Sequence, residues 1–367
     1  MMMQSALPQG DPGRLGFSLD ALKRLQAAIG RGIAERRFPG AVSLIARRGE
    51  IAWFDAQGKL GPNGDADMPT DAIFRIYSMT KPIVSVAVMT LYEEGKLLLA
   101  DPLHAYIPEF EGVKVGVEAG GRLELVPARR PITIQDLLRH SSGFTYDFVG
   151  TGPVQKLYSE AGLRRRNWSN AEFCRALAKL PLYRQPGTGW DYSVSTDVLG
   201  RLVETITGVT LREALFERIF GPLGMVDTDF FVPADKHRRI AEPFPAAPGS
   251  IEASLLFDPR NEPEFQSGGG GLMSTAGDYA RFLRMLENGG SLGGTRILGR
   301  KTLELMTSDH VPPGATIGSD LLPPGYGFGL GFAVRTVPGL AAMPGSVGQY
   351  YWGGIAGTTF FVDPREE

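Results

Sequence analysis

The chain has 367 residues, of which 43% are apolar and 10% aromatic, so it can bury a large core in one large domain or two interleaved ones. Its formal net charge of −2 provides no basic surface, which argues against nucleic acids and anionic membranes as partners. The single cysteine, Cys174, excludes an intramolecular disulfide within this sequence.

Targeting signals are not evident in the sequence. Residues 1–16 lack the order of basic, apolar and small residues that is typical of a secretory signal peptide. The longest apolar run, Pro82 to Leu91, ends at Glu93 and Glu94 and is too short to cross a membrane. We therefore expect a soluble, cytoplasmic protein.

The first quarter of the chain predicts a helix, a hairpin and a second helix. Apolar residues recur at helical spacing over residues 19–37, with charged residues on the other face. Residues 40–58 alternate as two strands around Arg48 and Gly49. After "FRIYSMTK" an apolar helix runs to Gly95, and residues 111–131 then predict a small surface hairpin.

The middle of the chain, from Thr133 to about Met225, has mainly helical patterns. Each pattern begins at a capping residue or ends at Gly or Pro, which are the usual signals of helix boundaries. The predicted helices are "TIQDLLRHSSG", "SNAEFCRALAKLP", "STDVLGRLVETITG" and "LREALFERIFGPLG".

The last third predicts one helix, "STAGDYARFLRMLENGG", and then glycine-rich aromatic strands in "GYGFGLGFAV" and "YWGGIAGTTFFVDP". We expect the N- and C-terminal strands to share one central antiparallel sheet flanked by helices, an α+β fold. Residues 1–85 and 235–367 would form this α/β domain, and residues 86–234 an inserted, mainly helical domain. A further strand is expected to pair beside residues 358–362.

Ser78 and Lys81 open the apolar helix, and they can be interpreted in two ways. Residues three apart lie on one face of a helix, so the two side chains can touch. Burial disfavours the charged form of a lysine, which lets a buried amine take a proton from a serine. The alternative is a helix-capping serine followed by a lysine that reaches solvent, and the bare S-x-x-K pattern does not separate the two.

Two later motifs favour the catalytic interpretation. Tyr192, in "GWDYSVSTDV", precedes a helix on a loop, where its hydroxyl can reach a neighbouring site. Gly353 and Gly354 leave room for a substrate to approach the backbone of a strand. Each feature alone has an ordinary structural explanation, but their order after Ser78 is much harder to obtain by chance.

With these residues, the sequence resembles the superfamily of penicillin-binding proteins and class C β-lactamases, and most closely its family VIII carboxylesterases. The resemblance extends over residues 15–362 and implies a β-lactamase/transpeptidase-like fold. The motifs that carry it are "FRIYSMTKP", "GKLLLADPLHAYIPEF", "ITIQDLLRHSSGF", "YSVSTDVLGRLVE", "GPLGMVDT", "GGGGLMSTAGDYARFL" and "WGGIAGTTFFVDP".

The resemblance also implies roles for individual residues. Ser78 would be the acylated nucleophile, Lys81 its base partner, and Tyr192 the residue that relays protons to the leaving group and to water. The run 352–354 occupies the place of the Lys-Thr-Gly triad. The backbone N–H groups of Ser78 and Ile355 would then form the oxyanion hole.

Two departures from the β-lactamase pattern point to the substrate. Val194 stands where β-lactamases have the asparagine of Tyr-x-Asn, and Trp352 replaces the lysine of Lys-Thr-Gly. Neither side chain offers the hydrogen bond or charge that holds the amide and carboxylate of a β-lactam. We therefore expect a serine carboxylesterase that acts on uncharged, short-chain acyl esters, with β-lactam hydrolysis at most a weak side activity.

Other functions compatible with the same fold are an acyltransferase, an amidase or D-peptidase, a β-lactamase, and a non-enzymatic β-lactam sensor. Residues 289–293 match the G-x-S-x-G nucleophile elbow of α/β-hydrolases, but a helix precedes them and a turn follows them. His140 is expected near the site without a catalytic role. His104 and His237 have no ligand-like partners, so we expect neither a metal nor a cofactor.

Overall fold

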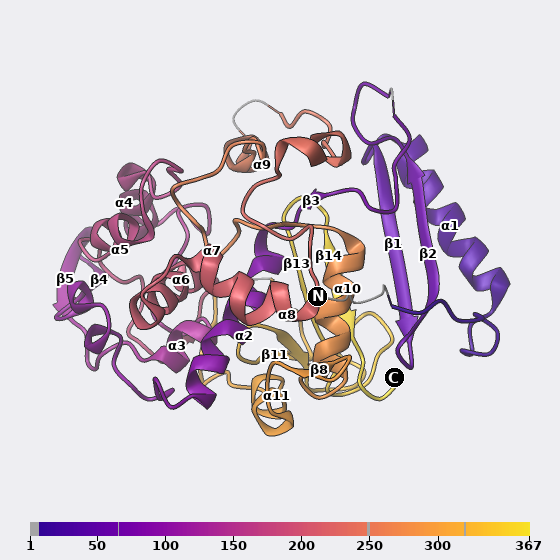
Figure 1. The fold of residues 1–367 in the computed structure, drawn as a ribbon. Coiled ribbons are helices and arrows are strands. Elements are labelled where there is room, and N and C mark those ends of the chain that lie inside the picture. Colours follow the sequence, from indigo (N-terminus) through magenta and orange to yellow (C-terminus); the bar gives the residue numbers. More distant parts are fainter. Residues whose placement is uncertain (1–6, 65, 248–249, 319–320) are drawn as a thin grey trace.

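The computed structural model describes residues 7–64, 66–247, 250–318 and 321–367. Three parts follow one another across the view of Figure 1: a hairpin with its helix on the right, a sheet in the middle, and a group of helices on the left. The central helix α2 (Thr80–Glu93) lies where the sheet and the helical group meet.

The N-terminal part is a helix packed on a hairpin, as the sequence predicts. Helix α1 (Leu19–Ala34) is capped by Ser18, whose hydroxyl accepts a hydrogen bond from the backbone N–H of Ala21. Strands β1 (Gly40–Arg47) and β2 (Glu50–Gly58) are antiparallel. Arg48 and Gly49 form the turn with positive φ angles, a conformation that glycine adopts without strain.

The middle of the chain is mainly helical, with the predicted surface hairpin at its outer edge. Thr133 and Ser169 cap their helices with reciprocal side-chain and backbone hydrogen bonds to the third residue of the helix. The elements are β4 (Lys114–Ala119), β5 (Arg122–Pro127), α3 (Ile134–Leu138), α4 (Pro153–Ala161), α5 (Asn170–Leu177), β6 (Gly189–Trp190), α6 (Ser195–Thr207), α7 (Leu211–Leu215), a π-helical turn (Phe216–Phe220) and α8 (Gly221–Leu223).

The last part contains the main sheet. Its strands pair antiparallel in the order β11, β12, β13, β14, with Trp352 opposite Phe360. The elements are α9 (Ile251–Leu255), β7 (Met273–Ser274), α10 (Ala276–Glu287), β8 (Ser291–Leu292), β9 (Thr295–Arg296), α11 (Arg300–Met306), β10 (Thr316–Ile317), β11 (Tyr326–Phe328), β12 (Ala333–Arg335), β13 (Tyr350–Gly353) and β14 (Thr359–Val362). Strand β7 pairs with β3 (Phe74–Arg75), directly before the Ser78 turn.

The expectation of one shared sheet is wrong in detail. Among the described residues, β1 and β2 pair only with each other, and β14 pairs only with β13. Helix α10 packs against β1 and lies between the hairpin and β14 in Figure 1. Alternation identifies strands but not which of their edges meet, so the sequence could not decide this point. The α+β class itself is confirmed.

The core is centred on α2, which is apolar on nearly every face. Its residues from Thr80 to Leu91 are all buried, as expected for a helix surrounded by other elements. The helix spans the predicted domain boundary at residue 85, and the division into two domains stays a prediction. No helix in the described part of the chain has both the length and the apolar character needed to span a membrane.

Candidate active site

Ser78 lies in a strained turn at the entrance to α2. The turn is a 3₁₀ helix over Tyr77–Met79 that runs directly into α2. Tyr77 has a φ of +41°, which is unfavourable for a residue with a bulky side chain and is typical of functional sites. Ser78 itself is only half-buried, so its hydroxyl remains accessible while its neighbours on both sides are buried.

Lys81 is fully enclosed, with 1% of its surface exposed. Its Nζ donates hydrogen bonds to Ser78 Oγ at 3.2 Å, to the Tyr146 hydroxyl at 3.1 Å and to the Gly269 carbonyl at 2.6 Å. Three oxygen acceptors therefore surround the amine. The lysine is therefore buried and directed at the serine, and the interpretation in which it reaches solvent is excluded.

Tyr192 completes the contacts of the serine hydroxyl. Its hydroxyl lies 2.6 Å from Ser78 Oγ, a short hydrogen bond. The tyrosine is buried between β6 and the start of α6, and Lys81 Nζ lies 4.6 Å from the centre of its ring. A cation over an aromatic face at this distance is attracted to the ring. Ser78, Lys81 and Tyr192 are thus brought together as the sequence predicts.

A buried carboxylate and a buried imidazole flank this group. Burial raises the pKa of Asp197, whereas the Lys81 charge and hydrogen bonds from Ser267 Oγ and the Gly269 N–H oppose that rise. Burial, with the Lys81 charge, holds the pKa of His140 well below its usual value, so its ring is neutral at pH 7. His140 bonds Ser193 Oγ rather than Ser78, as expected for a residue without a catalytic role.

Strand β13 brings the Trp-Gly-Gly run to the serine turn. A Cβ on Gly354 would lie 2.4 Å from the Ile76 carbonyl oxygen, so only glycine allows this close approach. Ile355 follows in an exposed turn. No backbone hydrogen bond between described residues uses its N–H, which leaves that group available to an oxyanion.

Both residues that depart from the β-lactamase pattern are buried, and Trp352 contacts Tyr192. Trp352 is 4% exposed, and its ring centre lies 5.3 Å from those of Tyr192 and Phe328. Its indole Nε1 is buried without a hydrogen-bond partner in the described structure. Val194 is buried one residue before α6. An aromatic wall therefore lies where the resemblance would place the β-lactamase cation.

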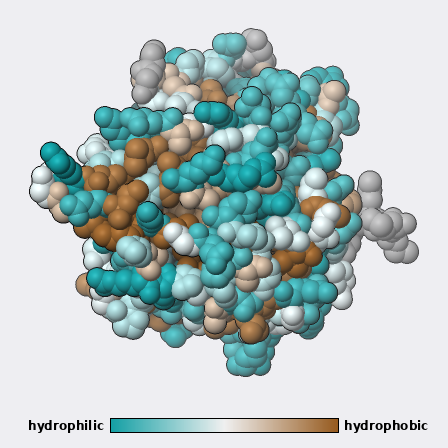
Figure 2. Space-filling view, turned by 90° about the vertical axis from the view of Figure 1, so that its left-hand side faces the viewer, coloured by the Kyte–Doolittle hydropathy of each residue, from teal (hydrophilic) through white to brown (hydrophobic). Residues whose placement is uncertain are grey.

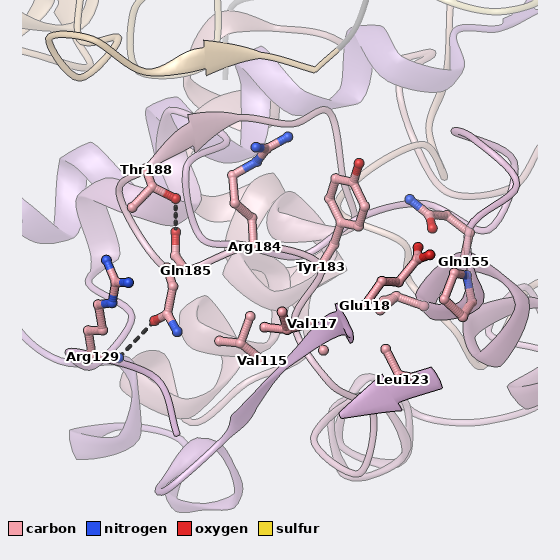
Figure 3. Close-up of a pocket in the computed structure, with 13 residues that line it drawn as sticks. Val115, Val117, Glu118, Leu123, Arg129, Gln155, Tyr183, Arg184, Gln185 and Thr188 are labelled. Carbon is pink, nitrogen blue, oxygen red and sulfur yellow. Dashed lines mark hydrogen bonds between the residues drawn. The ribbon is translucent and has the colours of Figure 1, made fainter. Parts of the chain in front are cut away.

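A cavity of about 460 Å³ lies away from this group. It is bounded by the β4–β5 hairpin, the start of α4 and the segment from Tyr183 to Thr188 (Figure 3). One residue that lines the cavity, Arg184, forms an ion pair with Asp191, which directly precedes Tyr192. None of the three proposed catalytic residues lines this cavity.

The face that carries the β4–β5 hairpin also has apolar surface. Figure 2 shows this side of the molecule, where apolar residues gather in a broad patch. Val117, Leu125 and Tyr183 are exposed apolar residues on these elements. Exposed apolar patches of this kind are found at binding surfaces.

The competing motifs do not form sites. The G-x-S-x-G run lies in the β8–β9 hairpin after α10, so the strand, turn and helix of a nucleophile elbow are missing. Nowhere in the described ranges do three or more His, Cys, Asp or Glu side chains gather as metal ligands.

Three contributors to the site were not identified from the sequence. Tyr146 lies 65 residues beyond Lys81, and the Gly269 carbonyl 188 residues beyond it. Asp197 is close to Gly269, where a Cβ would lie 2.4 Å from its carboxylate. The four consecutive glycines at 268–271 were the available signal, since such a run marks close backbone packing.

Comparison with known proteins identifies the family of the chain. Residues 25–367 match the family model described as β-lactamase. Esterase EstB of Burkholderia gladioli is 35% identical over 374 residues, which cover 95% of this chain and 89% of EstB. Protein Rv1367c of Mycobacterium tuberculosis (strain ATCC 25618 / H37Rv) is 38% identical over 337 residues, 89% of this chain and 83% of that protein.

Solved structures show the same fold. EstCE1, described as a hydrolase with promiscuous acyltransferase activity, has a TM-score of 0.79 and 29% identity, with 94% of this chain and 91% of EstCE1 covered. Simvastatin synthase LovD from Aspergillus terreus has a TM-score of 0.77 at 24% identity, with 95% and 91% covered, and supports the fold alone. The chain therefore belongs to the β-lactamase family, as a serine hydrolase of the family VIII carboxylesterase branch.

Proposed function

We propose that the protein hydrolyses short-chain acyl esters through a covalent intermediate on Ser78. The observation that supports this most directly is the convergence of Lys81 Nζ and the Tyr192 hydroxyl on Ser78 Oγ, at 3.2 and 2.6 Å. A serine becomes nucleophilic only when a neighbouring group can take its proton. EstB, at 35% identity, carries the name of an esterase and supports the same reaction class.

In the acylation step, Ser78 Oγ attacks the ester carbonyl carbon and its proton passes to the Lys81–Tyr192 pair, which enters the step one proton short, either as a neutral amine beside the phenol or as an ammonium beside the phenolate. Lys81 Nζ lies 3.2 Å from Ser78 Oγ and over the Tyr192 ring, so a proton held on this nitrogen stabilises negative charge on both oxygens. The base function then belongs to the Lys81–Tyr192 pair rather than to either residue alone. The carbonyl oxygen, negatively charged in the tetrahedral intermediate, would accept hydrogen bonds from the Ser78 and Ile355 N–H groups.

The leaving alcohol takes its proton from Tyr192, which leaves the acyl group on Ser78. Water then enters, gives a proton to the same pair and attacks the acyl carbon. The bond from the acyl carbon to Ser78 Oγ breaks, the pair returns the proton to Ser78 Oγ, and the carboxylic acid is released. Val194 and Trp352 lie beside Tyr192 without a charge or an amide. An uncharged acyl group fits this part of the site better than the carboxylate of a β-lactam.

The decisive test combines labelling with a substrate series. We expect a fluorophosphonate probe to label the wild type on Ser78 and to leave Ser78→Ala unlabelled. p-Nitrophenyl esters of increasing acyl length should be hydrolysed fastest at short chains, with slow or no turnover of nitrocefin. Near-normal esterase activity in Ser78→Ala would refute the assignment.

Acyl transfer is a second candidate, because EstCE1 is described as having promiscuous acyltransferase activity. On this site an alcohol would take the place of water in attacking the acyl-serine. Incubating an ester with an added alcohol and measuring the ratio of new ester to free acid separates the two reactions. Free acid as the main product at moderate alcohol concentration supports hydrolysis.

A further inference from the structure

Arg166 is a cation without an ion-pair partner among the described side chains, and it packs on Phe257, which contacts the residue before Ser78. Its guanidinium carbon lies 3.9 Å from the centre of the Phe257 ring, in a half-buried position after α4. Its Nη2 is buried and has no hydrogen-bond partner within the part of the chain that the structure describes. Burial lowers the pKa of Arg166 to about 10, so it still carries its charge at pH 7. A buried charge without a partner is costly unless a ligand supplies the counter-charge.

The neighbouring arginines differ from Arg166 because each has a carboxylate. Arg164 pairs with Asp147 at 2.8 Å, and Arg75 pairs with Glu242 at 2.9 Å. The charge of Arg75 lowers the pKa of Arg166, as expected when like charges lie close together. Among the side chains that the structure describes, none forms an ion pair or hydrogen bond with the Arg166 guanidinium. Of these three arginines, Arg166 is therefore the one whose positive charge is not balanced by a described carboxylate.

One aromatic ring separates Arg166 from the residue next to Ser78. Phe257, which lies under the guanidinium, also contacts Tyr77 edge to face at 5.7 Å between ring centres. The charge of Arg166 reaches Tyr77 and opposes the rise in pKa that burial causes there. Helix α9, whose Leu255 carbonyl accepts from the Tyr77 hydroxyl, lies above the start of α2 in Figure 1.

The other side of the same segment reaches Lys81. Arg164 binds Asp147, which directly follows Tyr146, and the Tyr146 hydroxyl is a hydrogen-bond partner of Lys81. The segment that carries Arg166 therefore adjoins the catalytic group both through Tyr77 and through Tyr146. A substrate group that extends from Ser78 toward this segment would meet the free guanidinium.

We propose that Arg166 binds a carboxylate carried by the ester substrate, so that the enzyme prefers acid-bearing esters such as half-esters of dicarboxylic acids. A guanidinium matches a carboxylate with two parallel hydrogen bonds and is only weakly hydrated, which suits a half-buried site. The Trp352 side of the site has no charge to offer, so the carboxylate would lie toward Arg166. This inference rests on the proposed esterase function and adds the substrate class.

The test compares two p-nitrophenyl esters, the half-ester of glutaric acid and the same compound with its free carboxyl methylated. The ratio of their kcat/KM values does not depend on how much of a variant is folded. We expect the wild type to favour the acid, and Arg166→Gln to lower the ratio about tenfold or more, the effect of one charged hydrogen-bonded pair. Arg166→Lys should retain part of the preference.

Arg165 provides a matched control, since its guanidinium carbon lies 5.5 Å from the Trp168 ring centre instead. Arg165→Gln should keep the wild-type ratio. An unchanged ratio in Arg166→Gln, an equal fall in Arg165→Gln, or a wild type without preference for the acid would each overturn the inference.

Failure of the proposed function gives a different result, because the wild type would then hydrolyse neither ester. In that case calorimetric titration of monomethyl glutarate into Ser78→Ala tests Arg166 without turnover. If monomethyl glutarate binds more weakly to the double variant Ser78→Ala with Arg166→Gln than to Ser78→Ala, the carboxylate site is supported. Equal binding in the two proteins contradicts it.

Discussion

At the scale of single residues, comparing Tyr146 with Tyr192 distinguishes a residue that positions Lys81 from one that contacts the nucleophile. It holds Lys81 Nζ at 3.1 Å but forms no hydrogen bond with Ser78 in the described structure. We expect Tyr146→Phe to lower kcat/KM about tenfold, the effect of one hydrogen bond to a charged group. Tyr192→Phe removes the 2.6 Å contact to Ser78 and should cost several orders of magnitude.

The measurement is kcat/KM for p-nitrophenyl acetate in both variants. Tyr158→Phe is the matched control, because the hydroxyl of Tyr158 is buried in α4 and no described residue forms a hydrogen bond with it. Its loss should leave the rate near the wild-type value. Equal rates in Tyr146→Phe and Tyr192→Phe would contradict the division of roles.

The substrate preference can be tested at the two altered positions. Val194→Asn combined with Trp352→Lys introduces an amide and a cation beside Tyr192. We expect nitrocefin hydrolysis to rise relative to hydrolysis of p-nitrophenyl acetate, because these groups can bind the amide and carboxylate of a β-lactam. Since Trp352 is buried, the ratio is the readout, and an unchanged ratio would refute the account of selectivity.

At the scale of elements, the close approach of β13 to the serine turn depends on Gly354. A Cβ there would lie 2.4 Å from the Ile76 carbonyl oxygen, whereas on Gly353 its nearest neighbour would be 3.3 Å away. We expect Gly354→Ala to push the end of β13 from the turn and to lower kcat at least tenfold, since oxyanion contacts need close positioning. Gly353→Ala should lose much less, and similar losses in both would argue against this.

At the scale of the whole molecule, Asp278 couples stability to pH. It lies in the first turn of α10 and is buried, which raises its pKa to about 6. In the unfolded chain the carboxyl ionises near pH 4, so between about pH 4 and 6 the unfolded state loses its proton first. This group therefore makes the free energy of unfolding fall as pH rises through that range, and the penalty is complete above it.

We expect Asp278→Asn to remove this slope. The free energy of unfolding of the variant minus that of the wild type should be about 2–3 kcal/mol larger at pH 7.5 than at pH 4. This holds when the amide oxygen keeps the hydrogen bonds from the Asp227 N–H and the Thr228 hydroxyl. Denaturant unfolding of both proteins from pH 4 to 8 measures the difference. A difference that does not vary with pH would show that Asp278 does not titrate in this way.

The sequence by itself determined much of the local structure and which types of side chain meet at the proposed site. Periodicity and caps located α1, the β1–β2 hairpin, α3, α5 and α10, because these signals act over a few residues. S-x-x-K fixed the spacing of Ser78 and Lys81 on one helix start, and the order of motifs indicated the family.

Only the tertiary structure decided the contacts between distant segments. It placed Tyr146 and the Gly269 carbonyl on Lys81 and separated the β1–β2 hairpin from the β11–β14 sheet. It also left Nη2 of Arg166 buried without a partner among the described residues. Strand pairing and ion pairing depend on which surfaces meet after the core has formed. Local patterns record that a side chain is apolar or charged, but its partner is chosen by packing across the whole chain.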